Sequence, residues 1–415
     1  MTTQAQEIKN MRLISHSDLN GFPNIGEGMA MQTLPDGRRI LWLAHESAPK
    51  DVTAVDVTDL SKPRVVTQTD LPYPHLRSNS LAVIEDTMLV AYQSNRPGQP
   101  GAGMGIYDIS DVEAPRQIAF FDTSGPHSRG VHCLWWVDGD YAYLSTGSGD
   151  FAPRNPKDDQ FCMIVDVKDL TRPVEVGRWA LPGIRKGDEA PVPERHPLFD
   201  IGHRVHNVNV YPERPDRAYL GWIDAGVIIL DISDKSDPKM ISQLNYHPPF
   251  PGFTHTVVPF FSREMLVVSQ EANQHEHGED YPKLIWLMDM RMESNPVMMS
   301  TLPMPEPERF INTPGRYGTH NIHENQPLES CFKSDTLVFG TLFNAGLRVW
   351  DTTNAFQPEE VAYFVPALPE GAPANAVNDV YVDENRIVYT VDRLRACQKS
   401  VLASMRRTMR WMIAT

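Results

Sequence analysis

Four histidines occupy the same place in four successive, similar stretches of the chain. The stretches read GVHCLWW, RVHNVNV, FTHTVVP and GTHNIHE, and their third residues are His132, His206, His255 and His320. Neutral imidazole nitrogens bind iron, copper and zinc, whereas neighbouring imidazoles gain little from one another and disfavour each other's protonation. The pattern therefore predicts four metal ligands. The alternative is a polar channel in which the histidines bind one another and water.

Three further stretches of the same kind, IGEGMAM, RSNSLAV and AVNDVYV, carry Glu27, Asn79 and Asn378 at the third place. We call the seven third residues the column, and none of them is apolar. Side chains alternate along a strand, so equivalent residues of equivalent strands are expected to point at one axis. His323 lies three residues beyond His320 and is expected to face away from that axis.

Charged and amide side chains lie close to the column in the sequence. The residues just before the column and two column amides are expected to bind a small, possibly anionic substrate at a channel mouth: Arg77, Arg129, Arg204, Arg316, Asn79 and Asn378. Carboxylates at the ends of the following strands are expected to accept ring N–H groups: Glu46, Asp224, Glu271 and Asp392, with Glu324 beside His323 as a further candidate. Glu46, Asp224 and Glu271 are also expected to take part in catalysis. The alternative for these charged residues is simple solvation, which is also expected for His275 and His277 in the loop-like QHEHGED.

A repeated motif indicates the elements that position these residues. Six segments, such as YDISDVEAP and LDISDKSDP, have an aspartate followed seven residues later by a proline; the aspartates are Asp56, Asp108, Asp166, Asp231, Asp289 and Asp351. An apolar run enters each motif, the aspartate makes a local side-chain-to-backbone turn, and the proline begins another strand. With two strands before each motif, the unit has four strands, as in a blade of a β-propeller.

The fold predicted from these units is all-β, a propeller most consistent with seven four-stranded blades. Residues 375–393 supply only two strands of the last blade, and the segment around MRLISHSDL (11–19) is expected to pair with it and close the ring. The predicted boundaries are an N-terminal extension over 1–11, one propeller over 12–395 and an irregular basic tail over 396–415. A short amphipathic helix is the alternative for this tail.

Runs such as VIILD and MIVD resemble the core of the LVIVD-repeat proteins over roughly residues 12–395. This resemblance implies the propeller fold and says little about function. A set of four histidines at a propeller axis is also similar, in arrangement only, to the iron site of carotenoid-cleavage oxygenases and to the metal sites of the selenium-binding, methanethiol-oxidising propellers. The analogy implies a transition metal, with iron or copper favoured and zinc open, on His132, His206, His255 and His320.

Composition narrows the expected partners. The net charge of −15 disfavours nucleic acid and anionic membranes. Four scattered cysteines without a CxxC pair are typical of a reducing compartment, and the N-terminus has no signal-like apolar run, so a cytoplasmic protein is expected.

Three functions stay open from the residues alone. The favoured one is a metal-dependent oxidoreductase or oxygenase acting on a small, possibly anionic organic molecule. The others are a non-catalytic interaction scaffold and a metal-free hydrolase or lyase with histidine and carboxylate as acid and base. The sequence does not indicate an oligomeric state.

Overall fold

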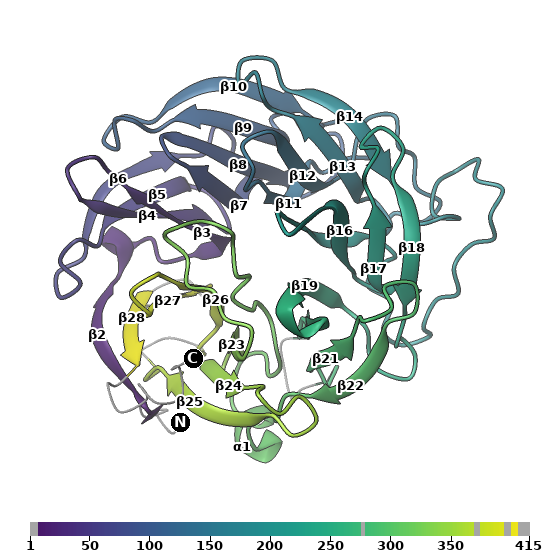
Figure 1. The fold of residues 1–415 in the computed structure, drawn as a ribbon. Helices are drawn as coiled ribbons and strands as arrows, with labels where there is room; N and C mark the ends of the chain where they lie inside the picture. Colours follow the sequence, from purple (N-terminus) through teal and green to yellow (C-terminus); the bar gives the residue numbers. More distant parts are fainter. Residues whose placement is uncertain (1–6, 275–278, 369–373, 394–399, 406–415) are drawn as a thin grey trace.

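The computed structural model describes residues 7–274, 279–368, 374–393 and 400–405. Within this part of the chain, seven antiparallel four-stranded sheets surround a central axis (Figure 1). The expectation of an all-β β-propeller is confirmed. Among these residues no helix is long and apolar enough to cross a membrane.

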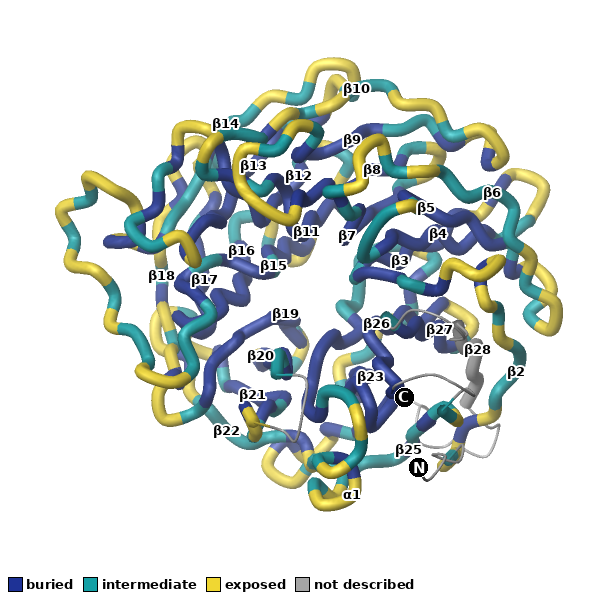
Figure 2. Tube along the Cα trace, turned by 180° about the vertical axis from the view of Figure 1, so that it is seen from behind, coloured by how far each residue is buried: buried dark blue, intermediate teal, exposed yellow. Residues whose placement is uncertain are grey.

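Five sheets consist of strands that follow one another in the chain, with the first strand of each next to the axis. Their strands are β3 (Ile25–Thr33), β4 (Arg39–His45), β5 (Lys50–Asp56) and β6 (Arg64–Asp70); β7 (Leu76–Ile84), β8 (Thr87–Ser94), β9 (Gly103–Asp108) and β10 (Arg116–Asp122); β11 (Val131–Trp135), β12 (Tyr141–Thr146), β13 (Phe161–Asp166) and β14 (Val174–Trp179); β15 (Val205–Tyr211), β16 (Arg214–Trp222), β17 (Gly226–Asp231) and β18 (Lys239–Leu244); and β19 (Thr254–Phe260), β20 (Met265–Gln270), β21 (Ile285–Asp289) and β22 (Val297–Thr301). The inner strands are buried and the outer strands are more exposed (Figure 2).

The other two sheets join both ends of the described chain. One contains β23 (Leu337–Thr341), β24 (Leu347–Asp351), β25 (Glu359–Val365) and, at its outer edge, β1 (Glu7–Lys9); the other contains β26 (Val377–Val382), β27 (Ile387–Asp392), β28 (Ser400–Met405) and β2 (Met11–Ser17). β2 pairs antiparallel with β28, so the predicted pairing of the N-terminal segment with the last sheet is confirmed. Short helices lie outside the sheets: η1 (Leu19–Gly21), η2 (Phe261–Arg263) and α1 (Pro307–Ile311).

The predicted domain boundaries were too narrow at both ends. β1 lies within the predicted extension and β28 within the tail that was predicted to be irregular. β1 covers the outer edge of β25, and β28 lies between β27 and β2, so both strands pair backbone groups that would otherwise remain unpaired. The rest of the tail, residues 406–415, lies outside the described residues.

The Asp–Pro motifs form the expected turns. In all six, the aspartate Oδ1 accepts a hydrogen bond from the backbone N–H two residues later, at 2.7–3.0 Å. This local bond ends the third strand of a sheet and directs the chain into the fourth.

The column coincides with a break in strand register. In six inner strands the pairing with the second strand shifts at the column residue, between Ile25/Met29, Ser78/Ser80, Val131/Cys133, Val205/Val208, Thr254/Val257 and Val377/Asp379. Such a bulge leaves a residue out of the ladder and re-aims its side chain. The fold therefore presents one irregular residue per inner strand to the axis.

His320 reaches the axis by a different route. Its segment is not a continuous strand but meets β23 through an isolated bridge, Ile322 with Gly340, and through the bond from His320 N–H to Thr341 O at 2.9 Å. The YGTHNIHEN stretch thus takes the place of an inner strand.

Ring closure by β2 predicts a matched pair of stability changes. Met11 is 1% exposed and packs with Phe339 and Val380, so Met11→Ala should lower the free energy of unfolding by about 2–5 kcal/mol. Met292 is 62% exposed, and Met292→Ala should change it by less than about 0.5 kcal/mol. Urea denaturation measures both, and an equal effect of the two substitutions would contradict the placement of β2 in the core.

Candidate metal centre on the propeller axis

Glu27 is carried to the axis by glycines on both sides. A Cβ on Gly26 would lie 2.8 Å from Asn79 O, and one on Gly28 would lie 2.6 Å from Leu81 N. The absence of side chains lets β3 lie against β7 backbone to backbone. Glu27, between the two glycines, extends towards the histidines, and its side chain is only 4% exposed.

The four column histidines form a continuous arc. The ring centroids of His132 and His206 are 4.4 Å apart, those of His206 and His255 3.7 Å, and those of His255 and His320 4.7 Å. All four residues are buried. The structure therefore brings together the four histidines that the repeat predicted to meet.

The Glu27 carboxylate faces three of these rings. Its Oε2 lies 3.8 Å from His206 Nε2 and 3.7 Å from His255 Nε2, and its Oε1 lies 3.4 Å from His320 Nε2. His132 reaches the group through His206, with 2.8 Å between the two Nε2 atoms. Arg393 donates to Glu27 Oε1 at 2.6 Å and thereby holds the carboxylate in place.

Each ring has its other nitrogen, Nδ1, close to a polar partner. The partner is Asn378 O for His320 at 2.6 Å, Thr256 Oγ1 for His255 at 2.6 Å and Asn207 Oδ1 for His206 at 2.7 Å. For His132 the partners are Gln93 Oε1 at 3.0 Å and the guanidinium of Arg77 at 3.1 Å. These bonds fix the ring orientations and leave the four Nε2 atoms towards the axis, which is how protein scaffolds orient metal-binding imidazoles.

Burial keeps three of the rings neutral. It lowers the pKa of His132 well below its ordinary value, and the nearness of the His206 ring adds to the effect. It lowers the pKa of His206 to about 3, with His255 as the next cause, and it also lowers the pKa of His255. Neutral imidazole is the form that ligates metal ions.

The two axial carboxylates are ionised. Burial alone would raise the pKa of Glu271, but electrostatic interactions with His320, Arg316 and Arg393 outweigh it and lower this pKa to about 2. Burial opposes ionisation of Glu27 as well, yet the neighbouring rings of His255, His320 and His206 hold its pKa well below the ordinary value.

Three overlapping sets of side chains have ligand atoms within 4.8 Å of one another: Glu27, His132, Cys133 and His206; Glu27, His255 and His320; and His206, His255 and Glu271. Each set combines histidine with a carboxylate, which the expectation of an all-histidine site left out. The buried Nε2 atoms of His255 and His320 have no hydrogen-bond partner. A metal ion bound to these two nitrogens would supply the missing interaction. A set of imidazole and carboxylate donors suits iron, copper or zinc.

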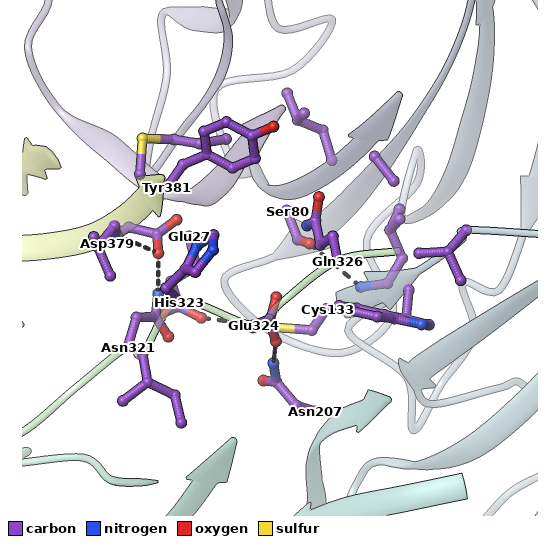
Figure 3. Close-up of a pocket in the computed structure, with 18 of the residues that line it drawn as sticks. Glu27, Ser80, Cys133, Asn207, Asn321, His323, Glu324, Gln326, Asp379 and Tyr381 are labelled. Atoms are coloured by element: carbon purple, nitrogen blue, oxygen red, sulfur yellow. Dashed lines mark hydrogen bonds between the residues drawn. The ribbon is translucent and has the colours of Figure 1, made fainter. Parts of the chain in front are cut away.

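Two pockets meet at Glu27. The arginine pocket has a volume of about 200 Å³ and is lined by Arg129, Arg204 and His206 among others. The acidic pocket, drawn in Figure 3, has a volume of about 50 Å³ and is lined by Leu134 and Asn207 among others. Along β11 and β15 the residues on the N-terminal side line the first pocket and later residues line the second. The pockets therefore lie on either side of the column.

The four predicted arginines all line the arginine pocket, and each has an acceptor. Arg77 binds Glu46, Arg129 binds Asp159 at 2.6 Å and Arg316 binds Glu271 at 3.0 Å. Arg204 donates to Lys157 O at 3.0 Å and lies 3.8 Å from Asp159, and its Nε has no hydrogen-bond partner. Arg204 is therefore the predicted arginine with the weakest ion pair.

Other predicted site residues have different surroundings from those expected. Asn79 and Asn378 do not face the arginine pocket; they are buried and donate to His132 O and Gly26 O, which ties neighbouring inner strands together. Asp224 accepts from Ile201 N–H and Gly202 N–H at 2.7 and 2.6 Å, so it fixes a loop. The position of a residue along its strand could not show in advance whether the residue holds the backbone, as these three do, or contacts a substrate.

The three carboxylates predicted to be catalytic therefore have three different surroundings, and of these three described residues only Glu271 contacts a column histidine. Glu271 Oε1 lies 3.7 Å from His320 Nε2, whereas Glu46 lies in the arginine pocket as the partner of Arg77. His323 lies outside the cluster, as expected: its Nε2 is 2.7 Å from Phe332 O and its Nδ1 accepts from Val382 N–H. His275 and His277 lie outside the described residues.

Sequence reasoning missed several residues at the centre. Glu27 stands in the column, and its place there was the signal that could have marked it as a ligand. Arg393 and Cys133 carried no such signal, because one follows β27 and the other is the neighbour of a column residue. Asp379 was missed as well, whereas Glu324 was a candidate; both line the acidic pocket, where burial raises the pKa of each to about 7.

Comparisons with known proteins support the fold. The sequence profile of the LVIVD repeat family matches residues 216–245, and no curated protein matches the chain. The crystal structure of the Cps50 (Swd1) β-propeller domain of Myceliophteria thermophila is 15% identical, with a TM-score of 0.55 over 97% of this chain and 100% of that chain. The WD40 β-propeller domain of Doa1 is 11% identical, with a TM-score of 0.54 over 97% and 98%.

A protein from Lactobacillus plantarum is 10% identical, with a TM-score of 0.53 over 81% of this chain and 87% of that chain. Identities this low show a shared propeller fold and nothing about the site. The likeness to the four-histidine oxygenases stays a prediction.

The buried neutral rings predict a pH effect on the metal-free protein. The unfolded chain protonates His206 below the ordinary histidine pKa of 6.5, whereas the folded chain keeps the ring neutral to about 3. Stability should therefore fall as the pH decreases from 6.5. Between about pH 6.5 and 5, His206→Gln should reduce the slope of the unfolding free energy by up to about 1.4 kcal/mol per pH unit. Urea denaturation after chelation measures this slope, and equal slopes for both proteins would show that His206 titrates normally.

Proposed function

We propose that the axial cluster binds a transition-metal ion, and that the protein is a metal-dependent enzyme acting on a small anionic organic molecule in the arginine pocket. The observation that carries the proposal is the pair of buried, partnerless Nε2 atoms of His255 and His320, which face one carboxylate. Buried polar atoms without a partner are costly and rare, so they indicate a missing ligand.

The protonation state of His320 makes this argument specific. The Asn378 carbonyl can only accept, so in the neutral form of His320 the proton is on Nδ1 and Nε2 presents a lone pair. That lone pair faces Glu27 Oε1 at 3.4 Å. Two acceptors repel each other, and 3.4 Å exceeds the usual length of about 2.7–3.2 Å for a hydrogen bond. A cation held by both atoms would turn this repulsion into attraction.

The donor set favours redox-active metals. Glu27, His255 and His320 form a set of two histidines and one carboxylate, the type that holds non-haem iron with open positions. His206, His132 and Glu271 surround this set and can complete it. A bound iron or copper ion would supply electron-transfer or oxygen chemistry there, and zinc would supply Lewis-acid chemistry.

The chain's own groups supply binding and orientation. Five arginines and three glutamates line the arginine pocket, which gives its wall an excess of positive charge. Arg393 and Arg316 hold Glu27 and Glu271 next to the rings. Arg204, with its weak ion pair, is the group most available to bind a substrate carboxylate beside His206.

The metal proposal predicts stoichiometric metal in protein purified without a histidine tag. His255→Ala and His320→Ala should each lower the bound metal strongly, since each removes a ligand of the two-histidine set. His75→Ala should leave it unchanged, because His75 lies at the surface next to Pro100 O. Mass spectrometry of metal content, with circular dichroism as the folding control, measures the effect. Metal-free wild-type protein would instead favour an interaction scaffold.

The substrate proposal predicts a separate effect at Arg204. In Co²⁺-loaded protein, Arg204→Ala should weaken the binding of benzoate, a simple carboxylate probe, by roughly 10-fold or more, the value of one charge-assisted hydrogen bond. The Co²⁺ content should not change, because Arg204 is not in any ligand set. Visible absorption of Co²⁺ reports both quantities. Loss of Co²⁺ with unaltered benzoate binding would refute this role of Arg204.

A further inference from the structure

Glu324 joins two distant parts of the molecule on the far side of the column from the arginine pocket. It follows His323 at the end of the YGTHNIHEN stretch and lines the acidic pocket (Figure 3). Its Oε1 accepts from Asn207 Nδ2 and from Asn209 Nδ2, both at 3.0 Å, and its backbone oxygen accepts from Tyr211 Oη at 2.8 Å. Three alternate residues of β15 thus hold one residue from the inner segment that lies two sheets further round the ring.

The bond to Glu324 decides how the Asn207 side chain is oriented. Ionised Glu324 can only accept, so above its pKa of about 7 the amide must turn its Nδ2 towards Glu324. The amide oxygen then points the other way, to His206 Nδ1 at 2.7 Å. An oxygen at that place can only accept, so Nδ1 of the neutral ring carries the proton and Nε2 presents its lone pair to the axis.

The opposite orientation of Asn207 would have the opposite effect. With its Nδ2 towards His206, the amide would donate to Nδ1 and favour a proton on Nε2. That proton would point at His132 Nε2, 2.8 Å away, and would block Nε2 as a ligand. His320 is protected from such a change because its partner is a backbone carbonyl. Of these two rings, only His206 depends on a side chain that can turn over.

We propose that Glu324 is a positioning residue of the axial centre: acting through Asn207, it holds His206 in the tautomer whose Nε2 presents the lone pair that a metal ion would bind. The ring tautomer itself is a property of the metal-free protein. The consequence for metal affinity rests on the function proposed above.

The test is nitrogen-15 NMR of histidine-labelled, metal-free protein, in which the ring shifts of His206 show which nitrogen carries the proton. Wild type and Glu324→Gln, which keeps an acceptor oxygen for Asn207, should show protonated Nδ1. Glu324→Leu should shift His206 towards protonated Nε2. Asn209→Leu removes the other amide donor to Glu324 without touching His206, so it is the matched control and should resemble wild type.

A second variant, Asn207→Leu, keeps the proposal testable if Glu324→Leu does not fold. Asn207→Leu removes the link while Asn209 and Tyr211 still hold Glu324, and it should also abolish the preference for protonated Nδ1. A wild-type ring pattern in folded Glu324→Leu or in Asn207→Leu would overturn the proposal, as would a wild-type His206 with its proton on Nε2.

Co²⁺ titration separates this proposal from the proposed function. Glu324→Leu should lower Co²⁺ affinity by about 10–100-fold, the usual effect of losing a residue that orients a ligand, and Glu324→Gln should keep it. If wild-type protein binds no Co²⁺, the metal function fails while the ring-proton result still stands. If wild-type protein binds Co²⁺, and Glu324→Leu and Asn207→Leu match it in Co²⁺ affinity and in the His206 tautomer, the proposed role of Glu324 is wrong while the metal function still stands.

Discussion

The shift of strand register at the column is the constraint on which the axial site depends. A regular pleat sends successive side chains to opposite faces, whereas a bulge adds a residue that is outside the ladder. Because the shift recurs at one height in six inner strands, the sheets deliver one polar side chain each to a small volume. The repeated apolar strands behind them provide the stability that such a polar centre lacks by itself.

The column residues divide this volume between two tasks. Asn79 and Asn378 bind the backbones of neighbouring inner strands and so tie the ring together. The histidines and Glu27 are turned towards one another instead, with neutral rings around an ionised carboxylate. Arg393 compensates one part of this charge, but two ring nitrogens remain without a partner. A bound cation is the simplest addition that satisfies them.

Much of this arrangement follows from the sequence, because it depends on repetition. The Asp–Pro motifs indicate the sheets, and the column of His132, His206, His255 and His320 indicates which side chains meet. The rest depends on contacts between distant segments. Nothing in the local sequence shows that Arg393 reaches Glu27, that Asp224 fixes a loop, or that β28 continues the last sheet. Glu27 is the instructive case, since its position in the column was visible and its role as central carboxylate was not.

The central claim is that the column forms one metal centre, and anomalous X-ray diffraction from crystals of the metal-loaded protein tests it most directly. Data collected on both sides of the absorption edge of the metal should show a single anomalous peak among Glu27 and the Nε2 atoms of His255 and His320. A peak elsewhere, or no peak on the axis in crystals shown to contain the metal, would contradict the account.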